Sequence, residues 1–136
     1  MENMLWIVVI VVLALIEFMV FGGMVGYARG KYQVPAPATT GNEIFERYFR
    51  VQQNTLEQLI VFIPSIWCFG TFVSGTWGAA LGAVFLLGRA IYAAGYIKAP
   101  KQRGPGFALS SLPTIVLLLG GLIGVIRAIL IVHRGT

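Results

Sequence analysis

The chain has 136 residues, enough for one domain, which we expect to cover residues 1–136. Hydrophobic residues make up 57% of it and charged residues 11%, and the mean hydropathy of +0.82 is too high for a water-soluble core of this size. The net charge of +5 comes from basic residues at the ends of apolar runs or inside them, and no nucleic-acid motif is present. We interpret these basic residues as signals of membrane topology or as contacts to an anionic ligand, and we expect no nucleic-acid partner. A single cysteine and a single histidine allow no intrachain disulfide and predict no metal site.

Four apolar runs predict an all-α membrane protein. Each run is near the roughly 20 residues that a helix needs to cross a bilayer, and none alternates as a membrane β-strand would. The predicted spans are residues 4–27, 46–74, 77–97 and 107–132. Glu17 is the single charge in the first span, and prolines interrupt the second and the fourth. Four spans with short connections indicate an up-down-up-down bundle.

The loops carry unequal charge. The loop after the first span holds Arg29 and Lys31, the loop after the third holds Lys98, Lys101 and Arg103, and the second loop holds none. The positive-inside rule therefore predicts that the first and third loops face the cytoplasm and that the N-terminus lies outside.

Glycines recur at a spacing of four residues, which lets helix backbones approach closely. The pairs are Gly22 and Gly26, Gly78 and Gly82, and Gly120 and Gly124. Because four helices alone make a thin bundle, we expect the protein to self-associate.

The start of the second span is unusually polar. On a helix, Arg47, Arg50, Asn54 and Glu57 fall within a band of roughly 80°, whereas Gln52 lies nearly opposite Arg50. In lipid, charges at this depth cost at least about 2.5–3.5 kcal/mol each by insertion scales. These side chains should therefore face the bundle, a subunit interface or a wet cavity.

The third span carries a second polar face on the same side of the membrane. Arg89, Tyr92 and Tyr96 follow the spacing i, i+3, i+7 and so share one helix face. A structural ion-pair network is one explanation for both faces, but such a network needs balanced charges, and here donors far outnumber carboxylates. The surplus favours a small ligand with several carboxylates and amides, of which glutathione is an example.

Glutathione chemistry requires a thiolate, whereas a free thiol has a pKa near ~8.5. A guanidinium about 4 Å away contributes up to about 4 kcal/mol at an effective dielectric of 20, which is at most about three pKa units. One well-placed arginine is therefore sufficient to ionise the thiol near neutral pH. By position, the candidates are Arg89 and Arg103.

Three stretches resemble the MAPEG family, the membrane-associated proteins of eicosanoid and glutathione metabolism. They are "FERYFRVQQNTLEQ" at 45–58, "GRAIYAAGY" at 88–96 and "KQRGPGFALS" at 101–110, and "PAPATTG" in the first loop fits as well. The resemblance implies a four-helix membrane bundle assembled as a homotrimer, with glutathione bound between neighbouring subunits.

The resemblance also implies roles for individual residues. By motif match, the thiolate-stabilising arginine is Arg103. The residues that it implies for glutathione binding are Arg29, Arg50, Gln52, Asn54, Glu57, Arg89, Tyr92 and Tyr96. The opposed faces of Gln52 and Arg50 would then serve two different subunits.

Two departures weigh against a leukotriene-type substrate. Gln58 stands where the leukotriene synthase branch has tyrosine, and Gly30 replaces the second residue of a basic pair. The stretch is more similar to microsomal glutathione transferases, including bacterial ones. We therefore expect a transferase that conjugates glutathione to lipophilic electrophiles in detoxification, with peroxidase activity toward lipid hydroperoxides as a second activity. The expected location is a bacterial inner membrane, with the active site toward the cytoplasm and in contact with lipid.

Two alternatives remain open from the sequence. One is a small four-helix drug/proton exporter that uses Glu17, since a lone acid within a span indicates function by default. In the transferase interpretation Glu17 would instead pair with an arginine of another helix, for which Arg127 is a candidate, or with a polar group across the subunit interface. The other alternative is a non-catalytic family member that binds lipid.

The predicted topology can be tested with a reporter fused to the C-terminus. Four spans with an external N-terminus place the C-terminus outside as well, so an enzyme reporter that works only in the cytoplasm should be inactive there. A cytoplasmic C-terminus would overturn the assignment.

Overall fold

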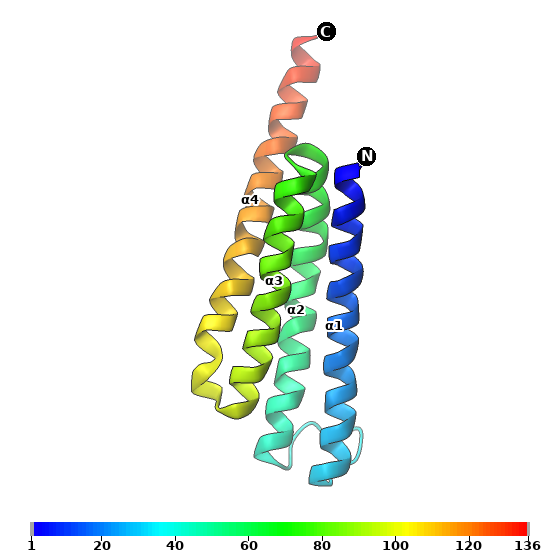
Figure 1. Ribbon diagram of the computed structural model, residues 1–136, viewed down its shortest axis with the longest axis vertical. Helices are drawn as coiled ribbons and strands as arrows, with labels where there is room; N and C mark the ends of the chain where they lie inside the picture. Colours follow the sequence, from blue (N-terminus) through cyan, green and yellow to red (C-terminus); the bar gives the residue numbers. More distant parts are fainter. Residues whose placement is uncertain (1, 136) are drawn as a thin grey trace.

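The computed structural model describes residues 2–135 and contains four long helices (Figure 1). They are α1 (Glu2–Tyr32), α2 (Glu43–Phe72), α3 (Gly75–Lys98) and α4 (Gly104–Arg134), with a short 3₁₀ helix, η1 (Pro100–Arg103), before α4. All four are long and apolar enough to cross a membrane, and residues 2–135 contain no strand. The expected all-α membrane bundle is confirmed.

The helices begin earlier and mostly end later than the apolar runs suggest, and a side-chain cap sets the beginning of α2 and of α3. Asn42 caps α2, where its side-chain oxygen accepts a hydrogen bond from the Phe45 backbone N–H at 2.9 Å. Ser74 caps α3 in the same way, accepting from the Trp77 N–H at 3.1 Å. The second span therefore ends at Phe72, two residues before the expected limit.

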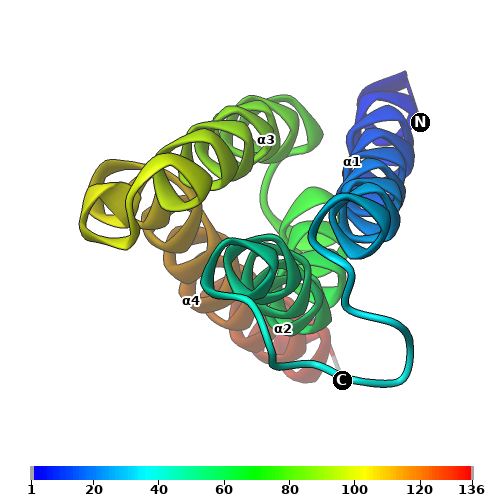
Figure 2. The ribbon, with the colours of Figure 1, turned by 90° about the horizontal axis from the view of Figure 1, so that it is seen from below.

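Helix α2 lies at the centre of the bundle and contacts the other three helices, with α1 and α4 on opposite sides of it (Figure 2). The core between them is apolar. The rings of Phe62 and Phe85 stack with centroids 3.8 Å apart, and Ile7 and Leu117 are fully buried in the same cluster. Every long helix thus contributes to one core.

Glycine sets the closest approach between helices, at two positions that the spacing pattern did not single out. A Cβ added at Gly88 would lie 2.6 Å from the Leu109 backbone, and one at Gly106 would collide with the Tyr92 backbone. Helices α3 and α4 are therefore held against each other near η1. Of the expected glycines, Gly78 packs against Ile7 of α1.

The remaining expected glycines behave unequally. Gly82 packs against α1 and α2, and Gly120 and Gly124 pack against α2. Gly26 faces open space, with no atom within 4 Å of an added Cβ. The spacing of four residues therefore predicted close contacts correctly for the glycines in α3 and α4. In α1 it did so for only one of the two glycines.

Two arginines hold the loop-bearing end of the bundle together. Arg47 donates from Nη1 to the backbone oxygens of Ile97 and Lys98, both at 3.2 Å, and so satisfies carbonyls at the end of α3. Arg29 donates to the backbone oxygen of Ala38 at 2.7 Å and fixes the loop between α1 and α2.

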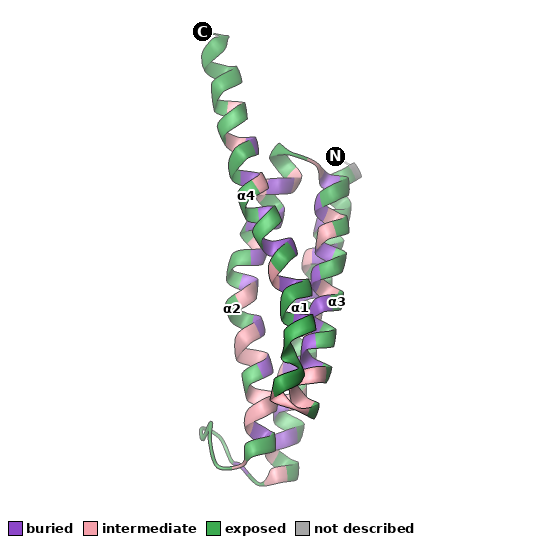
Figure 3. Ribbon diagram, turned by 90° about the vertical axis from the view of Figure 1, so that its left-hand side faces the viewer, coloured by how far each residue is buried: buried purple, intermediate pink, exposed green. Residues whose placement is uncertain are grey.

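Much apolar side chain remains uncovered in a single copy of the chain. The last turns of α4 extend beyond the other helices and are exposed on all sides (Figure 3). Met19 on α1 and Ile123 on α4 are 71% and 67% exposed. Such a surface requires lipid or another protein against it, in keeping with the membrane assignment.

The contact at Gly106 leads to a stability prediction. Replacing Gly106 by alanine should lower the unfolding free energy by about 1–3 kcal/mol or more, because the Tyr92 backbone cannot move aside. The matched control is Gly26→Ala, which enters open space and should be neutral or stabilising by up to about 1 kcal/mol. Thermal unfolding in detergent measures both variants. Equal effects would contradict the packing described here.

Candidate functional site

A polar pocket of about 300 Å³ lies where α2, α3 and α4 meet beside η1. Six residues line it: Arg50, Asn54, Tyr92, Tyr96, Arg103 and Phe107. Five of them are among the residues that the sequence singled out. Polar residues that the sequence pattern singled out are therefore brought together in one pocket of the structure.

Helix geometry explains this convergence. Arg50 and Asn54 are four residues apart on α2 and so lie one above the other. Tyr92 and Tyr96 have the same spacing on α3, and their rings stack with centroids 5.6 Å apart. Arg103 ends η1, so the turn between α3 and α4 delivers its guanidinium to the mouth of the pocket.

Arg89 lies behind the pocket wall and not in it. The side chain is fully buried, and its Nη2 donates to Asn54 Oδ1 and Thr55 Oγ1, each at 2.8 Å. Its Nη1 donates to Ser110 Oγ at 3.2 Å, and its guanidinium carbon lies 4.3 Å from the centre of the Tyr92 ring. The predicted shared face of α3 is thus present, but Arg89 uses it to hold neighbouring side chains.

Three other candidate residues lie outside this pocket. Gln52 points toward α1, with its Nε2 atom 3.1 Å from where a Cβ of Gly22 would be, so its predicted separation from Arg50 is real. Arg29 is engaged with the first loop. Glu57 is exposed on α2, within the face that carries Arg50.

Sequence reasoning missed three contributors. Phe107 lines the pocket, and the hydroxyls of Thr55 and Ser110 accept hydrogen bonds from Arg89. The sequence signal for Thr55 and Ser110 was a hydroxyl residue on the inner face of an apolar helix. Such a hydroxyl can accept a hydrogen bond from a buried donor on a neighbouring helix. Nothing in the helical spacing identified Arg89 as that donor.

Glu17 faces the bundle interior from α1. Its Oε1 atom is buried and accepts no hydrogen bond within residues 2–135. The expected partner Arg127 is wrong within one copy of the chain, because Arg127 is exposed on α4 and no ion pair of Glu17 is found among residues 2–135.

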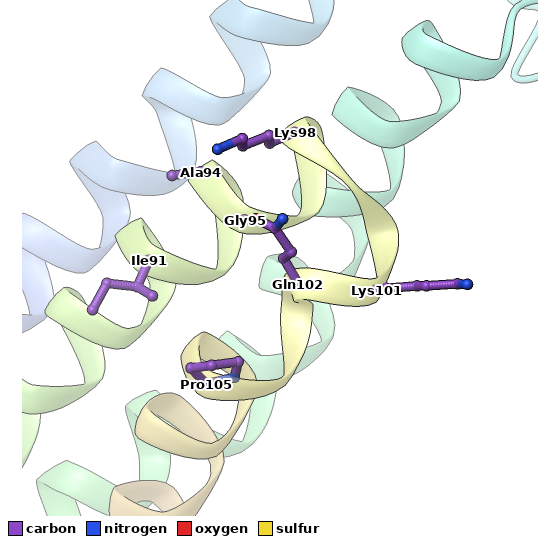
Figure 4. A pocket seen from close by; sticks show the side chains of 7 residues that line it. All are labelled: Ile91, Ala94, Gly95, Lys98, Lys101, Gln102 and Pro105. Atoms are coloured by element: carbon purple, nitrogen blue, oxygen red, sulfur yellow. The ribbon is translucent and has the colours of Figure 1, made fainter.

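A larger pocket of about 620 Å³ lies on the outer face of α3 against η1 (Figure 4). Its lining is mostly apolar and includes none of the candidate residues. Lys98 and Lys101 point in different directions, so they do not converge on one anion (Figure 4). A peptide ligand finds few hydrogen-bonding groups there, which leaves the smaller polar pocket as the candidate site.

The lining of the polar pocket is rich in donors and contains no carboxylate. Arg50 and Arg103 carry permanent positive charge, and tyrosine hydroxyls and an amide add oriented donors. Such a wall suits an anion that also has groups to hydrogen-bond, such as a carboxylate-bearing peptide or a thiolate.

Residues 5–123 match the model of the MAPEG family. The chain is 50% identical over 124 residues to an uncharacterized protein from Synechocystis, covering 91% of this chain and 90% of that protein. It is 41% identical to human microsomal glutathione S-transferase 2 over 110 residues, 81% of this chain and 75% of the relative. Bovine leukotriene C4 synthase is 37% identical over 76 residues, 56% of this chain and 51% of the relative.

The contact between Ser110 and Arg89 can be tested with neighbouring serines. Ser110→Ala should cost about 1–3 kcal/mol of unfolding free energy, because it leaves a buried guanidinium donor unpaired. Ser111→Ala is the control, since the Ser111 hydroxyl is buried without a partner among residues 2–135, and it should change stability by less than about 0.5 kcal/mol. Denaturation in mixed micelles compares the two. A cost at position 111 equal to that at 110 would refute the role of Ser110.

Proposed function

Because the chain belongs to the MAPEG family, we propose that it is a membrane glutathione transferase that activates the glutathione thiol for conjugation to lipophilic electrophiles. Relatives named as a glutathione S-transferase and a leukotriene C4 synthase support a glutathione-related transferase function at the level of the family. The observation that carries the finer assignment is the carboxylate-free, donor-rich pocket with Arg103 at its mouth.

Glutathione matches the chemistry of this pocket. It offers two carboxylates and two peptide bonds, which accept hydrogen bonds from guanidinium, hydroxyl and amide donors. The Arg50 guanidinium suits a carboxylate, whereas Tyr92 and Tyr96 of α3 add hydroxyl groups to the same lining. The ligand would be oriented by several donors at once.

Arg103 is the residue that we assign to the thiol. A thiolate about 4 Å from its guanidinium gains up to about 4 kcal/mol at an effective dielectric of 20. The gain stabilises the charged form, so the thiol pKa falls by as much as three units from about 8.5, before desolvation is subtracted. The proton leaves to water, and the thiolate sulfur forms a bond to the electrophilic carbon of the second substrate. In a substitution, the bond from that carbon to its leaving group breaks and the group departs with the electron pair; in an addition, the π electron pair shifts to the neighbouring atom, which takes a proton from water.

A neighbouring subunit is the proposed source of the remaining contacts. Glu57 lies 14 residues into α2, about 21 Å along the helix, and its side chain is exposed in a single copy. A carboxylate facing lipid at that depth is costly, so a partner is required. A homotrimer with glutathione between subunits would bring Glu57, and the Arg29 and Gln52 of another copy, to the ligand.

The orientation follows from charge. Lys98, Lys101 and Arg103 lie at the same end of the bundle as the polar pocket, which the positive-inside rule places at the cytoplasmic face of a bacterial inner membrane. The second substrate is a lipophilic electrophile that arrives through lipid, or a lipid hydroperoxide in the peroxidase reaction.

The alternatives are less well supported. An exporter of cations would expose Glu17 to its pathway, whereas here the Glu17 Oε1 atom is buried. A non-catalytic lipid-binding protein would not need Arg103 at the mouth of a polar pocket. Binding of glutathione without turnover would nevertheless favour that alternative.

The role of Arg103 is tested by titrating bound glutathione with pH and following thiolate absorbance. In the wild type the thiol should ionise well below its free pKa of about 8.5, and in Arg103→Ala its pKa should return toward that value, a rise of up to about three units. Arg103→Lys should retain part of the effect, since a charge remains.

Lys101→Ala is the matched control, because it removes a nearby positive charge that does not line the polar pocket. Its thiol pKa should stay close to that of the wild type. The same thiol pKa in Arg103→Ala and in the wild type would rule out Arg103 as the thiolate partner.

A further inference from the structure

The packing register of α1 and α3 brings two opposite charges to the same level of the bundle. The two helices run in the same direction (Figure 1), and Gly82 packs so closely on Ile10 that an added Cβ would lie 2.5 Å from the Ile10 Cγ2. Glu17 and Arg89 each follow these contact residues by seven positions. They therefore lie at the same level, two turns further into the bundle, although no ion pair within 4 Å joins them among residues 2–135.

Both groups are incompletely satisfied where they lie. Glu17 Oε1 and Arg89 Nε are buried and have no hydrogen-bond partner within residues 2–135. The three groups that accept hydrogen bonds from Arg89 are all neutral, namely an amide and two hydroxyls. The Arg89 charge thus lacks a carboxylate among its hydrogen-bond partners, and Glu17 is the acid that the helix register places at its level.

Arg89 also decides which atom of Asn54 faces the pocket. A guanidinium has donors and no acceptor, so the atom that meets Arg89 Nη2 at 2.8 Å must be the amide oxygen. The amide nitrogen then points to the other side, where Asn54 lines the pocket with Arg50. An amide turned the other way would offer an acceptor and repel an anion.

We propose that Glu17 and Arg89 form a charge couple that holds Asn54 in the orientation that presents its NH2 group to the anion pocket. Both are positioning residues, since Arg89 is fully buried behind Asn54 and Glu17 acts through Arg89. This inference deepens the proposed function, and its binding experiment rests on that function because it uses glutathione as the ligand.

The orientation of Asn54 is tested with Asn54→Asp in the full-length protein, using glutathione as probe and thiolate absorbance as readout. Aspartate keeps an oxygen for Arg89, so the variant should fold. It replaces a donor by a negative charge in the pocket, so the dissociation constant for glutathione should rise at least about tenfold. Unchanged or tighter binding would overturn the proposed orientation.

The charge couple is tested with Glu17→Gln, which keeps the shape and removes the charge. This variant should unfold at a lower temperature and bind glutathione several-fold more weakly, while the thiol pKa at saturation stays unchanged because Arg103 is intact. The control Glu43→Gln makes the same chemical change at a side chain that is 86% exposed and pairs only at the surface, with Arg47. It should lower the unfolding temperature far less than Glu17→Gln and leave glutathione binding and the thiol pKa unchanged. No effect of Glu17→Gln on stability or binding would overturn the couple.

The double variant Glu17→Gln/Asn54→Asp separates positioning from a general structural role. Its new aspartate supplies Arg89 with a carboxylate, so the unfolding temperature lost in Glu17→Gln should be recovered while glutathione binding remains weak. If the two substitutions instead lower the unfolding temperature additively, the proposal is refuted. If Glu17→Gln alone fails to fold, a double variant that also fails to fold refutes it.

The stability measurements need no ligand and so stand apart from the proposed function. If the wild type forms no thiolate, the transferase assignment fails, and the recovery of stability in the double variant still decides the charge couple.

Discussion

A guanidinium inside a membrane bundle must find its partners within the protein, because lipid offers neither charge nor hydrogen bonds. Arg89 meets this constraint with groups from each of the other long helices. Asn54 and Thr55 come from α2 and Ser110 from α4, and the Glu17 charge comes from α1. The relative positions of all four helices are tied to this one side chain.

Close backbone packing makes the arrangement possible. Gly88 and Gly106 allow α3 and α4 to approach so closely that Ser110 reaches Arg89. Arg103, at the end of η1, lines the same pocket as Arg50 and Asn54 of α2. The buried network and the donor-rich pocket are therefore two sides of one structure, with Asn54 in the wall between them.

Helical periodicity was sufficient to predict much of this. It predicted four helices, a shared face for Arg89, Tyr92 and Tyr96, and the separation of Gln52 from Arg50. These are properties of single helices, for which a rise and a turn angle decide which residues are neighbours.

Contacts between helices could not be predicted in the same way, because they depend on register and on which helices are adjacent. The sequence offered both Arg89 and Arg127 as basic residues within spans, and only the packing of Ile10 on Gly82 places Glu17 level with Arg89. Polar helix ends were also missed, since capping by Asn42 extends α2 beyond its apolar run.

A structure of the protein with glutathione bound tests the central claim most directly. We expect the glutathione sulfur within about 4 Å of the Arg103 guanidinium, an oxygen of the ligand at the Asn54 amide nitrogen, and Arg89 still buried on its three partners. Glutathione in the apolar pocket on the outer face of α3, or a ligand contacted by Arg89 itself, would contradict the account.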